Sequence, residues 1–333
     1  MTERTERIRR VLGGELVDRV PYSAWTHLPG IDLDPDRLAD ATLAFYRDLD
    51  LDFLKNMSNG MFSIEDYGCD CDFSAISEGG VASVTKYAVE APSDWETLSE
   101  LDIEKGALGR ELRSLSRLLH GLRGEAPVLA TVFSPLTTAQ KLSGTLLLEH
   151  LHTHPRRLKQ GLSRIAACTA RFAVRAIELG CAGLYFASQM SQRSLLAEEE
   201  YREFGVPYDL EVLEAVEGGS WFNVVHIHGD DILFGLLEGY PVQGISWHVW
   251  ETRPTVEDFI AADSAKCIVG GLRRSMITSD NFPELAKDVS GMMRITGGRR
   301  LMLAPGCVVR APYDKETLRY LRRTIDRARG TGP

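Results

Sequence analysis

The chain of 333 residues is long enough to bury a large hydrophobic core, as one α/β domain or as two smaller ones. Its hydrophobic share of 44% and charged share of 26% are ordinary for a globular protein. A net charge of −9 argues against a nucleic-acid or anionic-membrane surface, and no apolar run is long enough for a transmembrane helix.

The first predicted element is an amphipathic, charged helix near the N-terminus, within residues 1–21. This segment has no apolar stretch of the signal-peptide kind, so we expect a cytoplasmic protein. In a reducing compartment the six cysteines are expected to be free thiols.

Further along the chain, short β-rich apolar runs alternate with helical segments, which is typical of repeated βα units and a parallel sheet. The expected strands are 20–25, 53–57, 128–133, 183–187, 222–228, 244–248, 267–271 and 300–303. The expected helices include 36–48, 142–150, 155–179, 197–217, 230–237, 255–261, 281–295 and 315–327. Asp34 followed by Pro35 is a typical helix start, and Asp280 is placed to cap another helix.

Eight strands that are each followed by a helix predict an α/β fold of the (β/α)8 TIM-barrel type, here as one domain over residues 1–333. The surplus length fits the N-terminal helix and an inserted hairpin at about 61–95, with its turn at residues 78–80. An open doubly wound sheet is the alternative. A GxGxxG motif after an early strand would favour it, and the chain has none.

In a barrel the residues at the carboxyl ends of the strands face the active site. This rule nominates substrate-binding residues at Trp25, His27, Asn56, Phe133, Gln189, Trp247, His248 and Arg273. His226 and His228 lie at the end of the fifth strand, two residues apart, so both side chains point to the same face. Two imidazoles at this spacing, with Cys307 after the last strand, match a three-ligand zinc site that has one open position. The alternative is that the histidines only form hydrogen bonds and Cys307 is a small buried residue.

Four segments carry motifs of one family: RIRRVLGGELVDRVP at 7–21, FSPLTTAQKLSG at 133–144, EEYREFGVPY at 199–208 and PGCVVRAPYD at 305–314. Together they resemble the uroporphyrinogen decarboxylase superfamily, which also contains zinc-dependent, corrinoid-linked methyltransferases. The resemblance covers nearly the whole chain and implies a (β/α)8 barrel.

The resemblance is closer to the methyltransferase branch. True decarboxylases carry an arginine-rich segment after the first strand that binds substrate carboxylates, whereas residues 25–30 read WTHLPG. The methyltransferases use a His-x-Cys pair after the fifth strand and a distant cysteine after the eighth. These positions map onto His226, His228 in place of the cysteine, and Cys307.

The resemblance implies a Zn²⁺-dependent methyltransferase that activates a thiol or similar nucleophile, with a corrinoid on a partner protein as methyl donor. Two rival functions are a metal-free decarboxylase of a porphyrinogen or small carboxylic acid, and a non-catalytic binder of corrinoid or tetrapyrrole. Glu65 and Asp66 are read as solvated carboxylates or as an acid or ligand near the site. We interpret the CysXCys at 69–71 as structural and the HisThrHis at 152–154 as a solvated connection.

Overall fold

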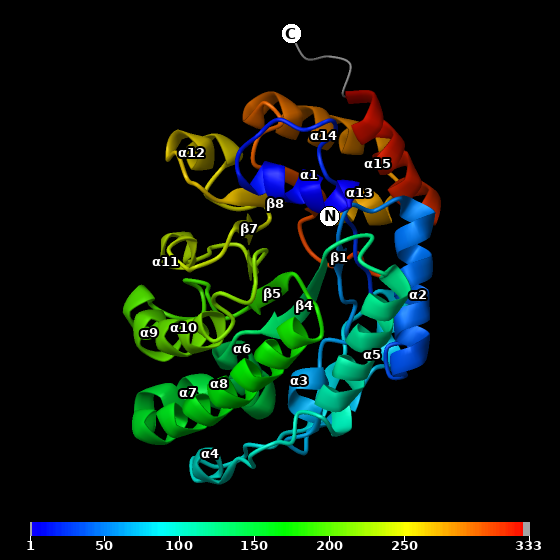
Figure 1. The fold of residues 1–333 in the computed structure, drawn as a ribbon. Coiled ribbons are helices and arrows are strands. Elements are labelled where there is room, and N and C mark those ends of the chain that lie inside the picture. The colour runs from blue at the N-terminus through cyan, green and yellow to red at the C-terminus, as the bar shows by residue number, and fades with distance from the viewer. Residues whose placement is uncertain (1, 329–333) are drawn as a thin grey trace.

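A computed structural model describes residues 2–328, and its central feature is a parallel sheet curled around a barrel axis (Figure 1). Seven strands follow one another in the order β1-β4-β5-β6-β7-β8-β9, and every neighbouring pair is parallel. Their bounds are Leu54–Lys55 (β1), Val128–Phe133 (β4), Gly183–Ser188 (β5), Val224–Ile227 (β6), Gly244–Ser246 (β7), Cys267–Leu272 (β8) and Leu301–Pro305 (β9).

The eighth place in the sheet belongs to the segment around Tyr22, which lies between β9 and β1. Tyr22 forms a parallel bridge with Leu303, and the Ser23 amide donates a hydrogen bond of 3.0 Å to Leu303 O. On the other side, the Asp52 amide donates to Tyr22 O at 2.8 Å. The expected strand at 20–25 is therefore reduced to a bridge, yet it joins both edges and gives the (β/α)8 TIM-barrel fold, which excludes the open doubly wound sheet.

Helices cover the outside of the sheet, as the alternation in the sequence predicts. Their bounds are Glu3–Leu12 (α1), Pro35–Leu49 (α2), Phe62–Glu65 (α3), Asp94–Thr97 (α4), Gly106–Leu122 (α5), Pro135–Ser143 (α6), Leu146–Thr153 (α7), Pro155–Glu178 (α8), Glu198–Phe204 (α9), Val206–Glu214 (α10), Phe234–Glu238 (α11), Val256–Ala261 (α12), Arg274–Thr278 (α13), Phe282–Thr296 (α14) and Lys315–Arg327 (α15).

Two expected helices are each divided in two, because a glycine interrupts them. Gly144, at a φ of +60°, separates α6 from α7, so the helix expected at 142–150 is wrong at its start. Gly205 separates α9 from α10 inside the helix expected at 197–217. The long helix α5 was not among the expected elements.

The inserted hairpin is present between α3 and α4. It consists of β2 (Asp70–Asp72) and β3 (Ser83–Lys86), which pair antiparallel, with a 3-10 helix at Ser74–Glu78 and a turn at Gly79 and Gly80 between them. Its tip reaches the barrel mouth, where Ile76 and Val81 contribute to the central cavity described below.

The amino ends of the strands are held together by a buried ion cluster around Asp52. The Asp52 carboxylate lies 2.8 Å from Arg7 of α1, 2.8 Å from Arg19, and 3.1 Å from Arg322 of α15. The Tyr22 amide donates to the same carboxylate at 2.9 Å. The first and last helices are thus tied to this end of the barrel.

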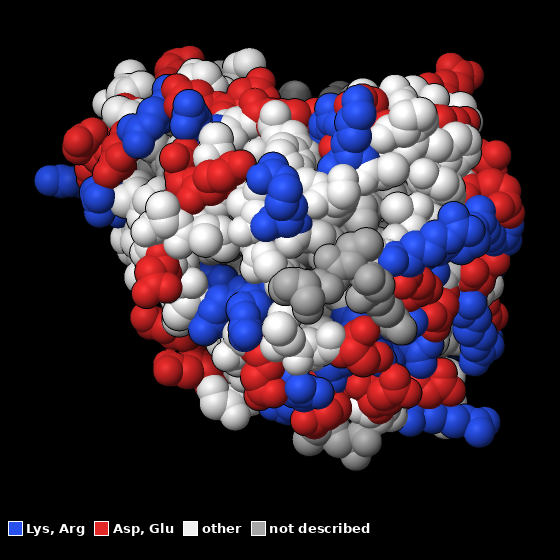
Figure 2. Space-filling view, turned by 90° about the horizontal axis from the view of Figure 1, so that it is seen from above, with Lys and Arg blue, Asp and Glu red and all other residues white. Residues whose placement is uncertain are grey.

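Charged groups on the surface are mixed in sign. Figure 2 shows the face around α14 and α15, where acidic and basic side chains alternate without a continuous basic field. Within residues 2–328, no helix is both long and apolar enough to cross a membrane. All six cysteines are unpaired, as expected.

Candidate metal centre and its pocket

Three histidines and one cysteine converge at the carboxyl ends of β6, β7 and β9. His226 lies in β6 and His228 directly follows it, His248 follows β7, and Cys307 follows β9. One potential ligand atom from each of the four side chains lies within 4.8 Å of all the others. The sequence nominated three of them as ligands, whereas His248 was assigned to substrate contact and lies here instead.

A hydrogen bond holds the His226 imidazole at Nδ1, and a carboxylate lies close to Nδ1 of His248. His226 Nδ1 lies 3.2 Å from Ser246 Oγ, and His248 Nδ1 lies 3.2 Å from the Glu251 carboxylate. The Nε2 atoms of both rings are buried and have no hydrogen-bond partner among residues 2–328. Metal-binding histidines typically have this arrangement, because a second partner fixes the ring while the other nitrogen binds the ion.

The protonation states favour a metal as well. Burial, together with the neighbouring histidines, lowers the pKa of His226 far below its usual range. Burial and the His248 ring lower the pKa of His228 to about 4. Neutral imidazoles are the form that binds metals. Cys307 Sγ lies 3.7 Å from His228 Nδ1, and burial raises the pKa of its thiol while Arg274 opposes the rise.

These four side chains fit a zinc-type ion. Zinc–ligand bonds of about 2.0–2.3 Å put tetrahedral ligand atoms roughly 3.5 Å apart, which is comparable with the separations of up to 4.8 Å in this group. Nitrogen and sulfur ligands suit zinc in particular. Three protein ligands with one open position are typical of catalytic zinc, whereas four closed ligands are typical of structural zinc.

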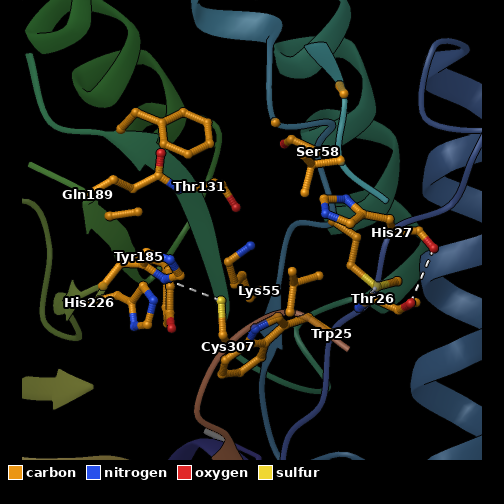
Figure 3. A pocket seen from close by; sticks show the side chains of 18 of the residues that line it. Trp25, Thr26, His27, Lys55, Ser58, Thr131, Tyr185, Gln189, His226 and Cys307 are labelled. Carbon is orange, nitrogen blue, oxygen red and sulfur yellow. Dashed lines mark hydrogen bonds between the residues drawn. The ribbon is translucent and has the colours of Figure 1, made fainter. Parts of the chain in front are cut away.

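A cavity of about 310 Å³ opens next to the metal centre inside the barrel mouth (Figure 3). Its walls include Trp25, Phe133 and Tyr185, and the rings of Trp25 and Tyr185 meet edge to face at 5.2 Å. His226 and Cys307 face the cavity together with His27, Ser58 and Gln189. The volume suits a small molecule.

The cavity is lined by four cationic side chains, Lys55, Lys141, Arg274 and Arg310, and no acidic side chain of the described chain lines it. Lys55 reaches into the middle of the cavity (Figure 3) and donates only a long hydrogen bond of 3.4 Å, to Asn56 O. Burial lowers the pKa of its ammonium to about 8. Lys141 Nζ donates to Gly60 O at 2.7 Å and lies over the Phe133 ring. These four side chains favour an anionic ligand.

The structure places Trp25, His27, Phe133 and Gln189 in the wall of the cavity, where the sequence put substrate contacts. Trp247 does not line it and is fully buried between the sheet and the helices, against Phe234 of α11 and Phe259 of α12. Neighbouring residues on a strand point to opposite faces, so Trp247 points outward where His248 points inward.

Two other assignments are corrected by the positions of neighbouring residues. Asn56 is buried behind the wall and hydrogen-bonds Glu111 and Ser58, while its neighbour Lys55 enters the cavity. Arg273 pairs with Asp288 and Glu284 of α14, and its neighbour Arg274 lines the cavity instead. Lys55 could have been found from the sequence by following the inward phase set by His226 and His228. Arg274 begins α13, beyond the end of β8, so strand alternation does not place it.

Other nominated groups have structural partners. Glu65 forms a two-bonded ion pair with Arg110 at 3.0 and 2.7 Å, and Asp66 accepts hydrogen bonds from the first amides of α5. His152 is exposed and contacts Glu200 at 2.7 Å.

Comparison with known proteins gives a consistent family signal. A family model described as Uroporphyrinogen decarboxylase (URO-D) matches residues 3–328. The methylcobamide:CoM methyltransferase MtbA of Methanosarcina acetivorans is 22% identical over 325 residues, covering 92% of this chain and 93% of the relative. Among solved structures, a methyltransferase from Methanosarcina mazei superposes with a TM-score of 0.82 at 18% identity, covering 98% and 99% of the two chains. A B12-independent methionine synthase from Shewanella sp. W3-18-1 has a TM-score of 0.58 at 12% identity over 94% and 97%.

Proposed function

Because the chain belongs to the uroporphyrinogen decarboxylase family, we propose that it is a corrinoid-linked methyltransferase that transfers a methyl group to a thiol in the barrel mouth. The single observation that carries this proposal is the group of His226, His228, His248 and Cys307. A decarboxylase that needs no metal gives no reason for unpartnered Nε2 atoms on two buried rings.

In this proposal three of the four side chains would hold a zinc ion, and the ion would activate the thiol of the acceptor. Ser246 and Glu251 orient His226 and His248. Bound zinc lowers the pKa of a coordinated thiol, so that a thiolate exists at neutral pH. The aromatic wall of Trp25 and Tyr185 restricts water around the sulfur.

The relatives are named methylcobamide:CoM methyltransferase, so we take a methylcobamide as the donor and the thiol CoM as the acceptor. The cavity of about 310 Å³ suits a small thiol and is too small for a whole corrinoid. We therefore propose that a separate corrinoid protein presents the donor at the mouth, in the cytoplasm. The cationic lining favours an acceptor with an acidic group such as 2-mercaptoethanesulfonate.

Metal content and methyl transfer test the proposal together. Purified protein is expected to hold about one zinc per chain, the count that a three- or four-ligand site implies. The protein is then mixed with methylcobalamin and 2-mercaptoethanesulfonate, and demethylation of the cobalamin is followed by the change in its absorbance. His226→Ala is expected to lose both the metal and the reaction, whereas His152→Ala, at an exposed histidine, keeps both. Metal-free native protein prepared without chelators would contradict the proposal.

The four cations also favour a second candidate function, a metal-free decarboxylase of a carboxylic acid. Arg274, Arg310, Lys55 and Lys141 supply positive groups that carboxylates need. In that case His226→Ala would leave turnover of a porphyrinogen or small acid largely intact, and added metal would not change it.

A further inference from the structure

Glu111 is a buried carboxyl that is one side chain away from the cavity. It belongs to α5, outside the sheet, and is fully buried. Its Oε2 accepts a hydrogen bond of 3.2 Å from Asn56 Nδ2, and the same amide donates to Ser58 Oγ at 2.9 Å. Interaction with the Ser58 hydroxyl lowers the pKa of the Glu111 carboxyl, which opposes the effect of burial. Since Ser58 lines the cavity that His226 and Cys307 face (Figure 3), one hydroxyl connects the carboxyl to the cavity.

The charges around Glu111 leave it poised between its two protonation states. Arg110 Nε lies 3.6 Å from Oε1, but this guanidinium is already held by Glu65. Asp32 and Glu65 add negative charge nearby, and Lys55 lies on the cavity side. Oε1 has no hydrogen-bond partner within the described residues. Burial raises the pKa of the Glu111 carboxyl to about 7.

We propose that Glu111 takes up, through the Ser58 hydroxyl, the proton that an acceptor thiol releases in the cavity. This inference rests on the proposed function, in which the acceptor reacts as a thiolate. The S–H bond breaks and its electron pair stays on sulfur. Ser58 takes this proton as it gives its own to the carboxylate, so one O–H bond forms on Glu111.

An internal transfer keeps the charge of the pocket constant. The thiolate adds one negative charge while the carboxylate loses one, so no extra charge is buried at this step. After the methyl group has arrived on sulfur, the thioether is neutral and the proton of Glu111 returns to solvent. Glu111 therefore holds the proton at a distance from the metal and does not touch the metal.

Calorimetry can count the protons directly. Zinc-loaded protein is titrated with 2-mercaptoethanesulfonate at pH 7.5 in several buffers that differ in ionisation enthalpy. The wild type is expected to release almost no proton to the buffer, whereas Glu111→Gln is expected to release about one per thiol bound. Ser58→Ala keeps the carboxyl but removes the connecting hydroxyl, so it is expected to release more protons than the wild type even if Glu111→Gln folds poorly.

Asp209 offers a matched control. It is a fully buried carboxyl whose pKa burial raises to about 7, but it bonds Tyr201 and Tyr240 and does not line the cavity. Asp209→Asn is expected to release as few protons as the wild type. Equal release by wild type, Glu111→Gln and Ser58→Ala would overturn the inference. Failure of every variant and the wild type to bind the thiol would instead contradict the proposed function.

Discussion

Asp52 and Lys55 are near neighbours on the chain, yet their charges have opposite surroundings. Asp52, before β1, receives three guanidinium groups and a backbone amide at the amino end of the barrel. Lys55, at the other end of the same short strand, has no ion-pair partner within residues 2–328 and points into a cavity. Both are charged side chains that the fold holds away from bulk water.

The difference separates stability from function along the barrel axis. At the amino end three guanidinium groups share the Asp52 carboxylate, so the cluster joins α1, α15 and the sheet. At the carboxyl end, two buried ring nitrogens have no hydrogen-bond partner within residues 2–328 and the Lys55 ammonium has no counter-ion there, which is costly unless a ligand supplies them. Barrel enzymes typically divide their two ends in this way.

The largest effect is expected when the shared counter-charge at the amino end of the barrel is removed. Asp52→Asn leaves three guanidinium groups without their shared counter-charge, and we expect it to lower the free energy of unfolding by about 3–5 kcal/mol. Urea denaturation followed by circular dichroism measures this. Asp40→Asn is the control, because its pair with Arg117 is exposed to solvent and contributes little to stability. Equal losses in the two variants would contradict the comparison.

The matching change at the carboxyl end is Lys55→Met. It removes a charge that has no counter-ion, so we expect the free energy of unfolding to be unchanged or higher. Binding of 2-mercaptoethanesulfonate is expected to weaken by roughly 10- to 100-fold, the equivalent of a charge-assisted hydrogen bond. Binding of 2-mercaptoethanol, which has no acidic group, should change little. An equal loss for both thiols would mean that Lys55 does not recognise the anion. The exposed Lys159 provides the control, as Lys159→Met.

Glu251→Gln tests whether the carboxylate beside His248 supports metal binding at the carboxyl end of the barrel. The carboxylate next to His248 Nδ1 is replaced by an amide of similar size, and we expect the zinc affinity to fall about 10- to 100-fold. Competition with a chromophoric chelator measures the affinity. Glu257→Gln, at an exposed position of α12, should leave it unchanged. Unchanged affinity in Glu251→Gln would remove His248 from the proposed ligand set.

The smallest effect is expected for Cys71→Ser in the inserted hairpin, because Cys71 is not part of the group of His226, His228, His248 and Cys307. The zinc content, determined by elemental analysis, should stay the same, whereas Cys307→Ser should lower it. Loss of zinc from Cys71→Ser would show that the CysXCys segment takes part in metal binding.

The sequence predicted the barrel because apolar runs and helical segments alternate with a clear rhythm, and seven of the eight expected strands form. The segment at 20–25 forms only a bridge, since its pairing depends on β9, at the other end of the chain. The divisions at Gly144 and Gly205 were missed because each glycine stands inside a run that is otherwise helical.

The candidate site shows a sharper limit. Strand ends can be located to within a residue or two, but a shift of one residue exchanges the inner and outer faces. That is why Asn56 was chosen where Lys55 faces inward, and why Trp247 was nominated together with His248. Arg274 faces the cavity from the start of α13, where strand alternation no longer applies. Glu111 was out of reach because it comes from a helix and meets the cavity only through Asn56 and Ser58.

The bridge at Tyr22 also has a consequence for how the protein is made. Thr26 Oγ1 donates a hydrogen bond to Val309 O, 283 residues away, and the same region seals the barrel. During synthesis the early strands must wait for almost the last part of the chain before their edges are covered. A ribosome that stops before β9 would therefore release a fragment with open strand edges, which invites pairing with other chains.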